Sequence, residues 1–149
     1  MGDRQVRLAT VDDMDALRDV YRRASLSNEG DRPLLEAHPE LLELDEDGVR
    51  EGRTIAATEH DAVVGFARVA HVADHLELEA LFVGPEHRRS GHAARLVAAA
   101  ADTARRSGVQ RIEVNANDHA RAFYEAMGFE EIGTARLQYG TAPRMVLLV

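Results

Sequence analysis

Residues 81–94 read Leu81-Phe82-Val83-Gly84-Pro85-Glu86-His87-Arg88-Arg89-Ser90-Gly91-His92-Ala93-Ala94, and this stretch decides the fold. The pattern predicts a strand, then a turn containing proline and glycine, then an alanine-rich helix. The first turn of a helix has unpaired N–H groups and the positive end of the helix dipole, so it forms an anion site. Small residues at Gly91 and Ala93 leave room for a phosphate to reach the backbone.

The local charge supports the anion interpretation. Arg88, Arg89 and Arg95 outnumber Glu86 here, although the whole chain carries a net charge of −8. The alternative is an ordinary strand-to-helix turn with a solvated arginine patch. No Gly-Lys-Ser/Thr follows, which excludes a Walker loop. The segment is not a dinucleotide-binding fingerprint either, because that motif needs three glycines.

Outward from this stretch, hydrophobic periodicity predicts alternating strands and helices. The expected strands are Gln5–Ala9, Arg53–Thr58, Ala62–Ala70, Leu76–Val83, Arg111–Asn115, Glu131–Arg136 and Arg144–Val149. The expected helices are 14–24, 33–44 with an interruption at Pro39, 92–107, and one that Asp118 caps and that ends at Gly128. Thr10 followed by Asp13 resembles a capping box before the first of them. Because a helix connects Leu76–Val83 to Arg111–Asn115, these two strands should be parallel.

Length, composition and charge limit the number of domains, the location and the kinds of partner that are expected. A length of 149 residues with 45% apolar residues fits a single domain over 1–149. No apolar run approaches the ~18 residues of a membrane span, and the first residues do not resemble a secretory signal, so a cytoplasmic location is expected. There is no cysteine, and the negative charge argues against nucleic acid as a partner. That charge would attract a cationic small molecule, or it serves solubility alone.

Two motifs in this order carry a family resemblance. Arg88-x-x-Gly91-x-Ala93 follows the strand, and Asn117-x-x-Ala120-x-x-Phe123-Tyr124-x-x-x-Gly128-Phe129 comes later. Together they resemble the GNAT superfamily of N-acetyltransferases, and the element order agrees over nearly the whole chain. The resemblance implies an α/β GNAT fold: a mixed, mostly antiparallel twisted sheet with a central parallel strand pair and about four flanking helices.

The resemblance also implies an acetyl-CoA site. Backbone groups of Leu81 and Val83, with Phe82 between them, would hold the acetyl group and the pantetheine arm, which Asn117 would also bond. Tyr124 would lie beside the CoA sulfur and protonate the leaving thiolate; the alternative is a core tyrosine packed on Phe129. The pyrophosphate would lie on the segment formed by Arg88, Arg89, Ser90, Gly91, His92, Ala93 and Ala94.

An ammonium acceptor must lose a proton before it can attack. Glu77 and Glu79 share a strand face with Leu81 and Val83, and either is a candidate base. Glu79 is favoured because it is nearer the acetyl end; the alternative for both is an exposed strand face. An ordinary glutamate, with a pKa near ~4.3, is a weak base for this task, so a raised pKa or a water relay is expected.

The predicted function is therefore acetyl transfer from acetyl-CoA to a primary amine by direct attack in a ternary complex. A small-molecule acceptor, possibly cationic in class, is favoured over a protein, and the acidic stretch Glu36–Asp47 would attract it unless that stretch is a solvated loop. The alternatives are a transferase for a longer acyl group and a non-catalytic acyl-CoA sensor or interaction module on the same fold. We expect a monomer or homodimer.

No metal site is expected among the seven histidines. His71 and His75 have i, i+4 spacing but lie between strands, where that spacing does not place them on one face. His87 and His92 flank the proposed pyrophosphate loop, and the alternative for both is a solvated position.

Overall fold

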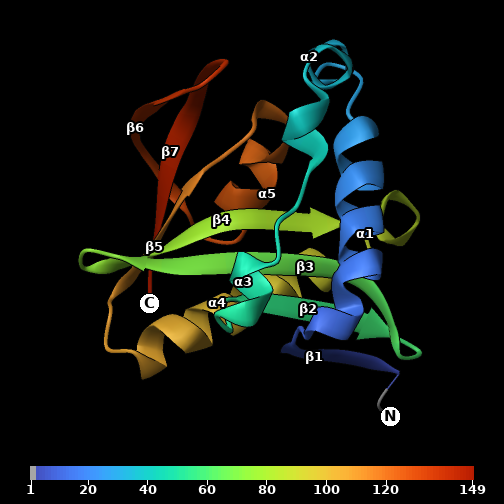
Figure 1. Ribbon diagram of the computed structural model, residues 1–149. Helices are drawn as coiled ribbons and strands as arrows, with labels where there is room; N and C mark the ends of the chain where they lie inside the picture. The colour runs from blue at the N-terminus through green and yellow to red at the C-terminus, as the bar shows by residue number, and fades with distance from the viewer. Residues whose placement is uncertain (1–2) are drawn as a thin grey trace. The chain divides into compact units, whose positions relative to one another are not determined.

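The computed structural model describes residues 3–149; Met1 and Gly2, part of the segment behind the expectation of no secretory signal, lie outside the described residues. Strand pairing gives one mixed sheet in the order β1-β2-β3-β4-β5-β7-β6 (Figure 1). Its strands are β1 Arg4–Leu8, β2 Thr54–Glu59, β3 Ala62–Val72, β4 His75–Val83, β5 Arg111–Asn115, β6 Glu130–Leu137 and β7 Gly140–Leu148. The central β4–β5 pair is parallel, and the β1–β2, β2–β3, β5–β7 and β6–β7 pairs are antiparallel. The predicted fold class is confirmed.

Helices lie between β1 and β2, between β4 and β5 and between β5 and β6, as predicted, and α3 is an additional one. The α-helices are α1 Met14–Leu26, α2 Arg32–Ala37, α3 Asp47–Arg50, α4 His92–Arg106 and α5 Arg121–Ala126. Short 3-10 turns are η1 Val11–Asp13, η2 Pro39–Leu42, η3 Pro85–His87 and η4 Asp118–Ala120. Within residues 3–149, no helix has the length and apolar character to span a membrane.

The chain divides into two compact units, which we describe separately. The first unit comprises residues 3–68 and 80–97, and the second comprises residues 69–79 and 98–149. Strands β3 and β4 and helix α4 contribute residues to both units. The expectation of one domain over 1–149 stays a prediction.

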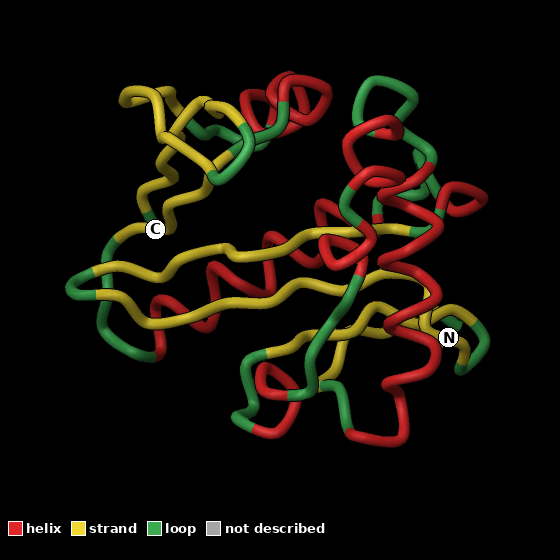
Figure 2. Tube along the Cα trace, turned by 45° about the horizontal axis from the view of Figure 1, so that its top comes forward, coloured by secondary structure: helices red, strands yellow, loops and turns green. Residues whose placement is uncertain are grey.

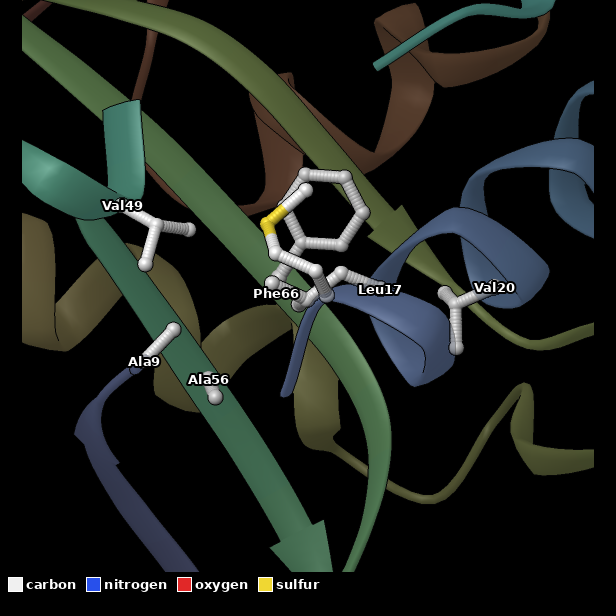
Figure 3. Close-up of a cluster of buried hydrophobic side chains, with 7 residues drawn as sticks. Ala9, Leu17, Val20, Val49, Ala56 and Phe66 are labelled. Carbon is white, nitrogen blue, oxygen red and sulfur yellow. The ribbon is translucent and has the colours of Figure 1, made fainter. Parts of the chain in front are cut away.

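The core of the first unit forms where α1 packs on β2 and β3. Leu17 and Val20 lie one turn apart on α1 and are fully buried against Ala56 and Phe66 (Figure 3). The apolar residues that recur at helical spacing along α1 therefore face the sheet. Burying a leucine of this kind contributes roughly 1.5–3 kcal/mol, so this stripe fixes α1 on the sheet.

The start of the first helical segment is held by a local carboxylate. The Asp13 carboxylate accepts hydrogen bonds from the Thr10 backbone N–H at 2.8 Å and from the Arg7 guanidinium at 2.8 and 3.0 Å. The hydrogen bonds from Arg7 lower the pKa of Asp13 to about 2. This arrangement confirms the capping interaction expected between Thr10 and Asp13.

The second unit is built on β5 and the hairpin of β6 and β7 (Figure 2). Ile112 and Val114 of β5 are buried, and β7 pairs with β5 on one side and β6 on the other. The residues of β6 are mostly exposed, as expected for the last strand of a sheet.

Three local details differ from the sequence predictions. The predicted interruption at Pro39 is confirmed, because His38 before it leaves the helical region at φ −131° and ψ 72°, but the second piece is the 3-10 turn η2, which ends at Leu42 rather than at residue 44. Helix α3 was not predicted; its Gly48 lies where a Cβ would be 2.4 Å from Arg68 Cδ, so a side chain would not fit. Asn117, rather than Asp118, is the N-cap residue of the segment leading into α5.

Candidate functional site

The proposed anion loop has the backbone shape that its sequence implies. Arg89 and Gly91 adopt positive φ values of 62° and 82°, and α4 begins directly afterwards at His92. A Cβ built on Gly91 would meet nothing within 4 Å, so open space adjoins the backbone there. The 15-residue helix α4 begins directly after this exposed glycine, and its first amides are the groups expected to bind an anion.

Side chains of the loop are tied to its surroundings within the first unit. Arg88 donates a hydrogen bond to the Ser27 hydroxyl at the end of α1, and Arg23 of α1 pairs with Glu86. The Ser90 carbonyl accepts a hydrogen bond from Arg4 at 2.8 Å. With Arg88 committed to α1, the donors left for an anion include the backbone, the exposed Arg89 and Arg95, whose Nη1 has no hydrogen-bond partner among the described residues.

The end of β4 lies against β3 at a glycine. A Cβ on Gly65 would be 2.9 Å from the Phe82 carbonyl oxygen, so only glycine permits this approach. The Phe82 ring contacts Tyr21 with centroids 4.8 Å apart, which turns it toward α1. Since side chains alternate along a strand, Leu81 and Val83 face the other way. A lone glycine in a predicted strand was the available signal for this close approach.

Three polar side chains converge beside the anion loop; the sequence placed His87 and His92 at the ends of that loop but did not connect them with Glu59. His92 Nε2 lies 2.8 Å from Glu59 Oε2, and His87 Nδ1 lies 3.8 Å from the same oxygen. The hydrogen bond with His92 lowers the pKa of Glu59. His92 is fully buried, so the alternative of a solvated position is wrong for it. We call Glu59, His87 and His92 the loop cluster.

Glu77 belongs to a different group of charges in the second unit, the Arg144 cluster of His75, Glu77, Glu113 and Arg144. Two guanidinium nitrogens of Arg144 donate to the two Glu77 carboxylate oxygens, each at 2.6 Å. Arg144 also contacts Glu113 at 2.9 Å, and His75 Nε2 lies 2.9 Å from Glu77. Burial raises the pKa of Glu77, but the hydrogen bonds from Arg144 and His75 outweigh burial and hold it below its usual value.

Glu79, two residues along β4, is exposed. The parallel ladder with β5 pairs Leu76, Glu77 and Leu78, so Glu79 is the first residue of β4 after that ladder. The structure thus separates the two candidate bases: Glu77 is held by a guanidinium, and Glu79 has a side chain open to solvent.

Tyr124 lies in α5 and is 5% exposed. Its ring packs edge-on against Phe129 and Phe123, with centroids 5.1 and 5.4 Å away. Burial raises the pKa of its hydroxyl well above the usual value. Among residues 3–149, the hydroxyl has no protein hydrogen-bond partner. The packing expected of a core tyrosine is present, and the hydroxyl remains available as a donor.

Asn117 is exposed and caps η4, and its carbonyl accepts the Ala120 N–H at 2.9 Å. Its side chain makes no capping hydrogen bond. The predicted site residues therefore fall into two groups: 81–83 and 88–94 lie in the first unit, whereas Glu77, Glu79, Asn117 and Tyr124 lie in the second.

A pocket of 460 Å³ opens in the first unit beside α1. Its lining carries both signs of charge and comprises Arg18, Arg22, Leu42, Glu43, Leu44 and Asp45. It includes part of the acidic stretch that was expected to attract an acceptor.

A model of the Acetyltransferase (GNAT) family matches residues 13–129, and the chain therefore belongs to this family. A search of the curated proteins found no relative of significant similarity.

Solved structures share the fold at low identity. A GCN5-related N-acetyltransferase from Rhodopseudomonas palustris superposes with a TM-score of 0.81 at 18% identity, covering 100% of this chain and 98% of that one. PaiA N-acetyltransferase from Thermoplasma acidophilum, solved with coenzyme A, gives 0.76 at 16% identity, covering 98% and 99%. YncA from Salmonella typhimurium, described as a putative acetyltransferase and solved with acetyl-CoA, gives 0.70 at 19% identity, covering 99% and 94%.

Proposed function

We propose that this protein is an acetyl-CoA-dependent N-acetyltransferase whose acceptor is a primary amine. The observation that carries the proposal is the open backbone at Gly91, at the start of α4, in a chain of the acetyltransferase family. In this proposal the amides of residues 89–94 hold the pyrophosphate. Backbone groups of Leu81 and Val83, beyond the β4–β5 ladder, hold the acetyl group and the pantetheine arm, and Asn117 bonds that arm as well.

Tyr124 is the proposed donor to the leaving sulfur. A thiolate of pKa near ~8.5 is a weaker base than an ordinary tyrosinate near ~10, so full proton transfer is uphill. The raised pKa of Tyr124 makes it steeper, and it also keeps the hydroxyl protonated at every physiological pH. A hydrogen bond that strengthens as charge develops on sulfur is therefore the main contribution that we assign to Tyr124.

Glu79 is the preferred base. Accepting a proton at Glu77 would break its charge-assisted bonds to Arg144, which is why the pKa of Glu77 is lowered and its basicity reduced. Glu79 is exposed, and this exposure suits a water relay between the ammonium and the carboxylate.

The acceptor is proposed to be a small amine drawn to the pocket beside α1. Glu43 and Asp45 would attract an ammonium, while Arg18 and Arg22 would attract a carboxylate. The mixed lining supports an amine that also carries an acidic group, such as an amino acid or a peptide N-terminus, alongside the simple cationic amine expected from the sequence.

A thiol-release assay with acetyl-CoA tests the proposal over amino acids, peptides, polyamines and aminoglycosides. The chain contains no lysine, so lysine acetylation of the enzyme cannot contribute to the signal. Turnover with an amine supports the enzyme. Acetyl-CoA binding without turnover on any amine class would favour the sensor alternative.

Two variants connect that activity to the site. Gly91→Glu places a bulky anion where the phosphate is proposed to lie, and it should weaken acetyl-CoA binding in calorimetry. Tyr124→Phe should retain binding but lower kcat by about 100-fold, because the aromatic packing is kept and the donor is lost. Unchanged affinity in the first variant, or unchanged kcat with rate-limiting chemistry in the second, would refute the corresponding assignment.

A further inference from the structure

The loop cluster has the donor types and spacing of a metal site. One nitrogen of His87, one of His92 and a carboxylate oxygen of Glu59 all lie within 4.8 Å of one another. A tetrahedral ion with bonds of 2.0–2.2 Å separates its ligand atoms by roughly 3.3–3.6 Å. The observed separations of 2.8 Å for His92–Glu59 and 3.8 Å for His87–Glu59 bracket that value. Small side-chain shifts would bring all three onto one ion.

Burial gives the cluster a rigid base and an open side. The His92 side chain is 0% exposed, whereas those of Glu59 and His87 are 24% and 31% exposed. His92 Nδ1 is buried with no hydrogen-bond partner among the described residues, so Nε2 alone makes the polar contact of this ring. A metal ion at Nε2 would replace the hydrogen bond to Glu59 by a bond from each residue to the ion, and the side of Glu59 and His87 provides an entry path.

Among the described residues, no guanidinium forms a hydrogen bond with the loop cluster, and Arg4 acts on Glu59 through its charge alone. In the Arg144 cluster, Arg144 forms hydrogen bonds to both glutamates and supplies their cation. Within residues 3–149, no arginine forms an ion pair with Glu59; the nearby Arg4 donates to the Ser90 carbonyl instead. The carboxylate and two imidazoles are therefore available to a different cation.

We propose that Glu59, His87 and His92 bind a divalent transition-metal ion of the zinc type. Two imidazoles and one carboxylate suit Zn²⁺, and three protein ligands leave a fourth position for water. This inference departs from the expectation of no metal site, because Glu59 is 33 residues from His92 in sequence and that spacing matches no metal motif.

The location gives the ion a consequence. His87 and His92 stand on either side of Arg88–Gly91, so one ion bound to both would hold the two ends of the anion loop together. Its positive charge would also favour a phosphate nearby. Metal binding and acetyl-CoA binding should therefore strengthen each other by the same factor; this part rests on the proposed function, and metal binding itself does not.

The test uses tag-free protein stripped of metal with a chelator, without acetyl-CoA. We expect one equivalent of Zn²⁺ in competition with a chromophoric chelator, and visible Co²⁺ bands of a tetrahedral site. His87→Gln and Glu59→Gln should weaken Zn²⁺ binding by about 10-fold or more, whereas His71→Gln, at an exposed position on β3, should not. The partly exposed His87 is preferred to the fully buried His92, and urea unfolding checks that each variant folds. Absent binding, or equal binding in all four proteins, overturns the proposal.

A second titration measures acetyl-CoA affinity with and without Zn²⁺, since the thioester has no free thiol to bind the metal. Tighter binding with Zn²⁺ in the native protein, but not in His87→Gln, supports the loop-holding role. Equal affinity with and without Zn²⁺ overturns that role while leaving the metal site standing. A protein that binds Zn²⁺ but no acetyl-CoA would refute the proposed function alone.

Discussion

The loop cluster and the Arg144 cluster use the same kinds of residue for different ends. Each combines histidine with glutamate, and each has a buried histidine. In the Arg144 cluster, a guanidinium forms hydrogen bonds to both glutamates, which makes the charges a closed structural network. In the loop cluster, Glu59 has histidine partners but no arginine partner among the described residues. A histidine–glutamate group is therefore open to a ligand when no guanidinium forms hydrogen bonds with its carboxylate.

Removing the built-in cation should have the largest effect. Arg144→Leu leaves Glu77 without its guanidinium partner and Glu113 with Arg111 alone, and we expect a loss of about 3 kcal/mol in the free energy of unfolding. Urea unfolding measures it, with Arg105→Leu as the control because Arg105 pairs with Asp102 at an exposed position. That control should change stability by less than about 1 kcal/mol.

The effect should depend on pH in one direction. Burial raises the pKa of Glu113, but hydrogen bonds from Arg111 and Arg144 outweigh it, and the net pKa is lowered, as for Glu77. A lowered pKa contributes stability above the ordinary value of about 4.3 and loses it as pH falls through the folded-state pKa. The gap between native protein and Arg144→Leu should therefore narrow below pH ~4; a constant gap would contradict the network.

The next two variants compare Glu77, which Arg144 holds, with the exposed Glu79. Glu79→Gln should lower kcat/KM by about 10-fold or more and flatten the acidic limb of the pH–rate profile, because it removes the proposed base. Glu77→Gln should mainly reduce stability and keep that limb. Should Glu77→Gln flatten the limb instead, the base is Glu77 and our preference for Glu79 is wrong.

A solvent-facing pair provides the smaller reference. Asp13, with a pKa of about 2, accepts hydrogen bonds from Arg7, whose side chain is 40% exposed. After allowance for screening, the pair should contribute about 1–2 kcal/mol above pH ~4, lost as pH falls toward 2. The stability difference between native protein and Asp13→Asn, measured from pH 6 to pH 2.5, should shrink across that window. A difference that grows toward low pH would be inconsistent with the lowered pKa.

The smallest effect is expected in the loop cluster without added metal. Glu59→Gln keeps an acceptor for His92 and removes a charge with which no arginine forms an ion pair among the described residues, so the unfolding free energy should fall by much less than in Arg144→Leu. Chelator-treated protein in urea is the measurement. A loss comparable to that of Arg144→Leu would show that Glu59 is a structural carboxylate, and the contrast between the clusters would disappear.

Features that depend on residues close together in the chain could be predicted from the sequence. Periodicity located α1 and α4, the helix between two strands gave the parallel β4–β5 pair, and Gly91 indicated the turn before α4. The two motifs then gave the family, which the match over residues 13–129 establishes. These features were readable because helix geometry, turn dihedrals and crossover direction are set within a few dozen residues.

Which charged side chains contact one another depends on the tertiary structure and could not be predicted from the sequence. Glu77 and Arg144 are 67 residues apart, and they meet because the β4–β5 register places Glu77 beside Glu113 while Arg144 pairs with Asn115 across β5 and β7. Likewise, Glu59 ends β2 while His92 begins α4, so no local pattern links them. A one-residue change of register would turn each strand residue to the opposite face, and periodicity alone does not fix register. Whether a carboxylate pairs with an arginine or is open to a ligand therefore depends on the tertiary structure.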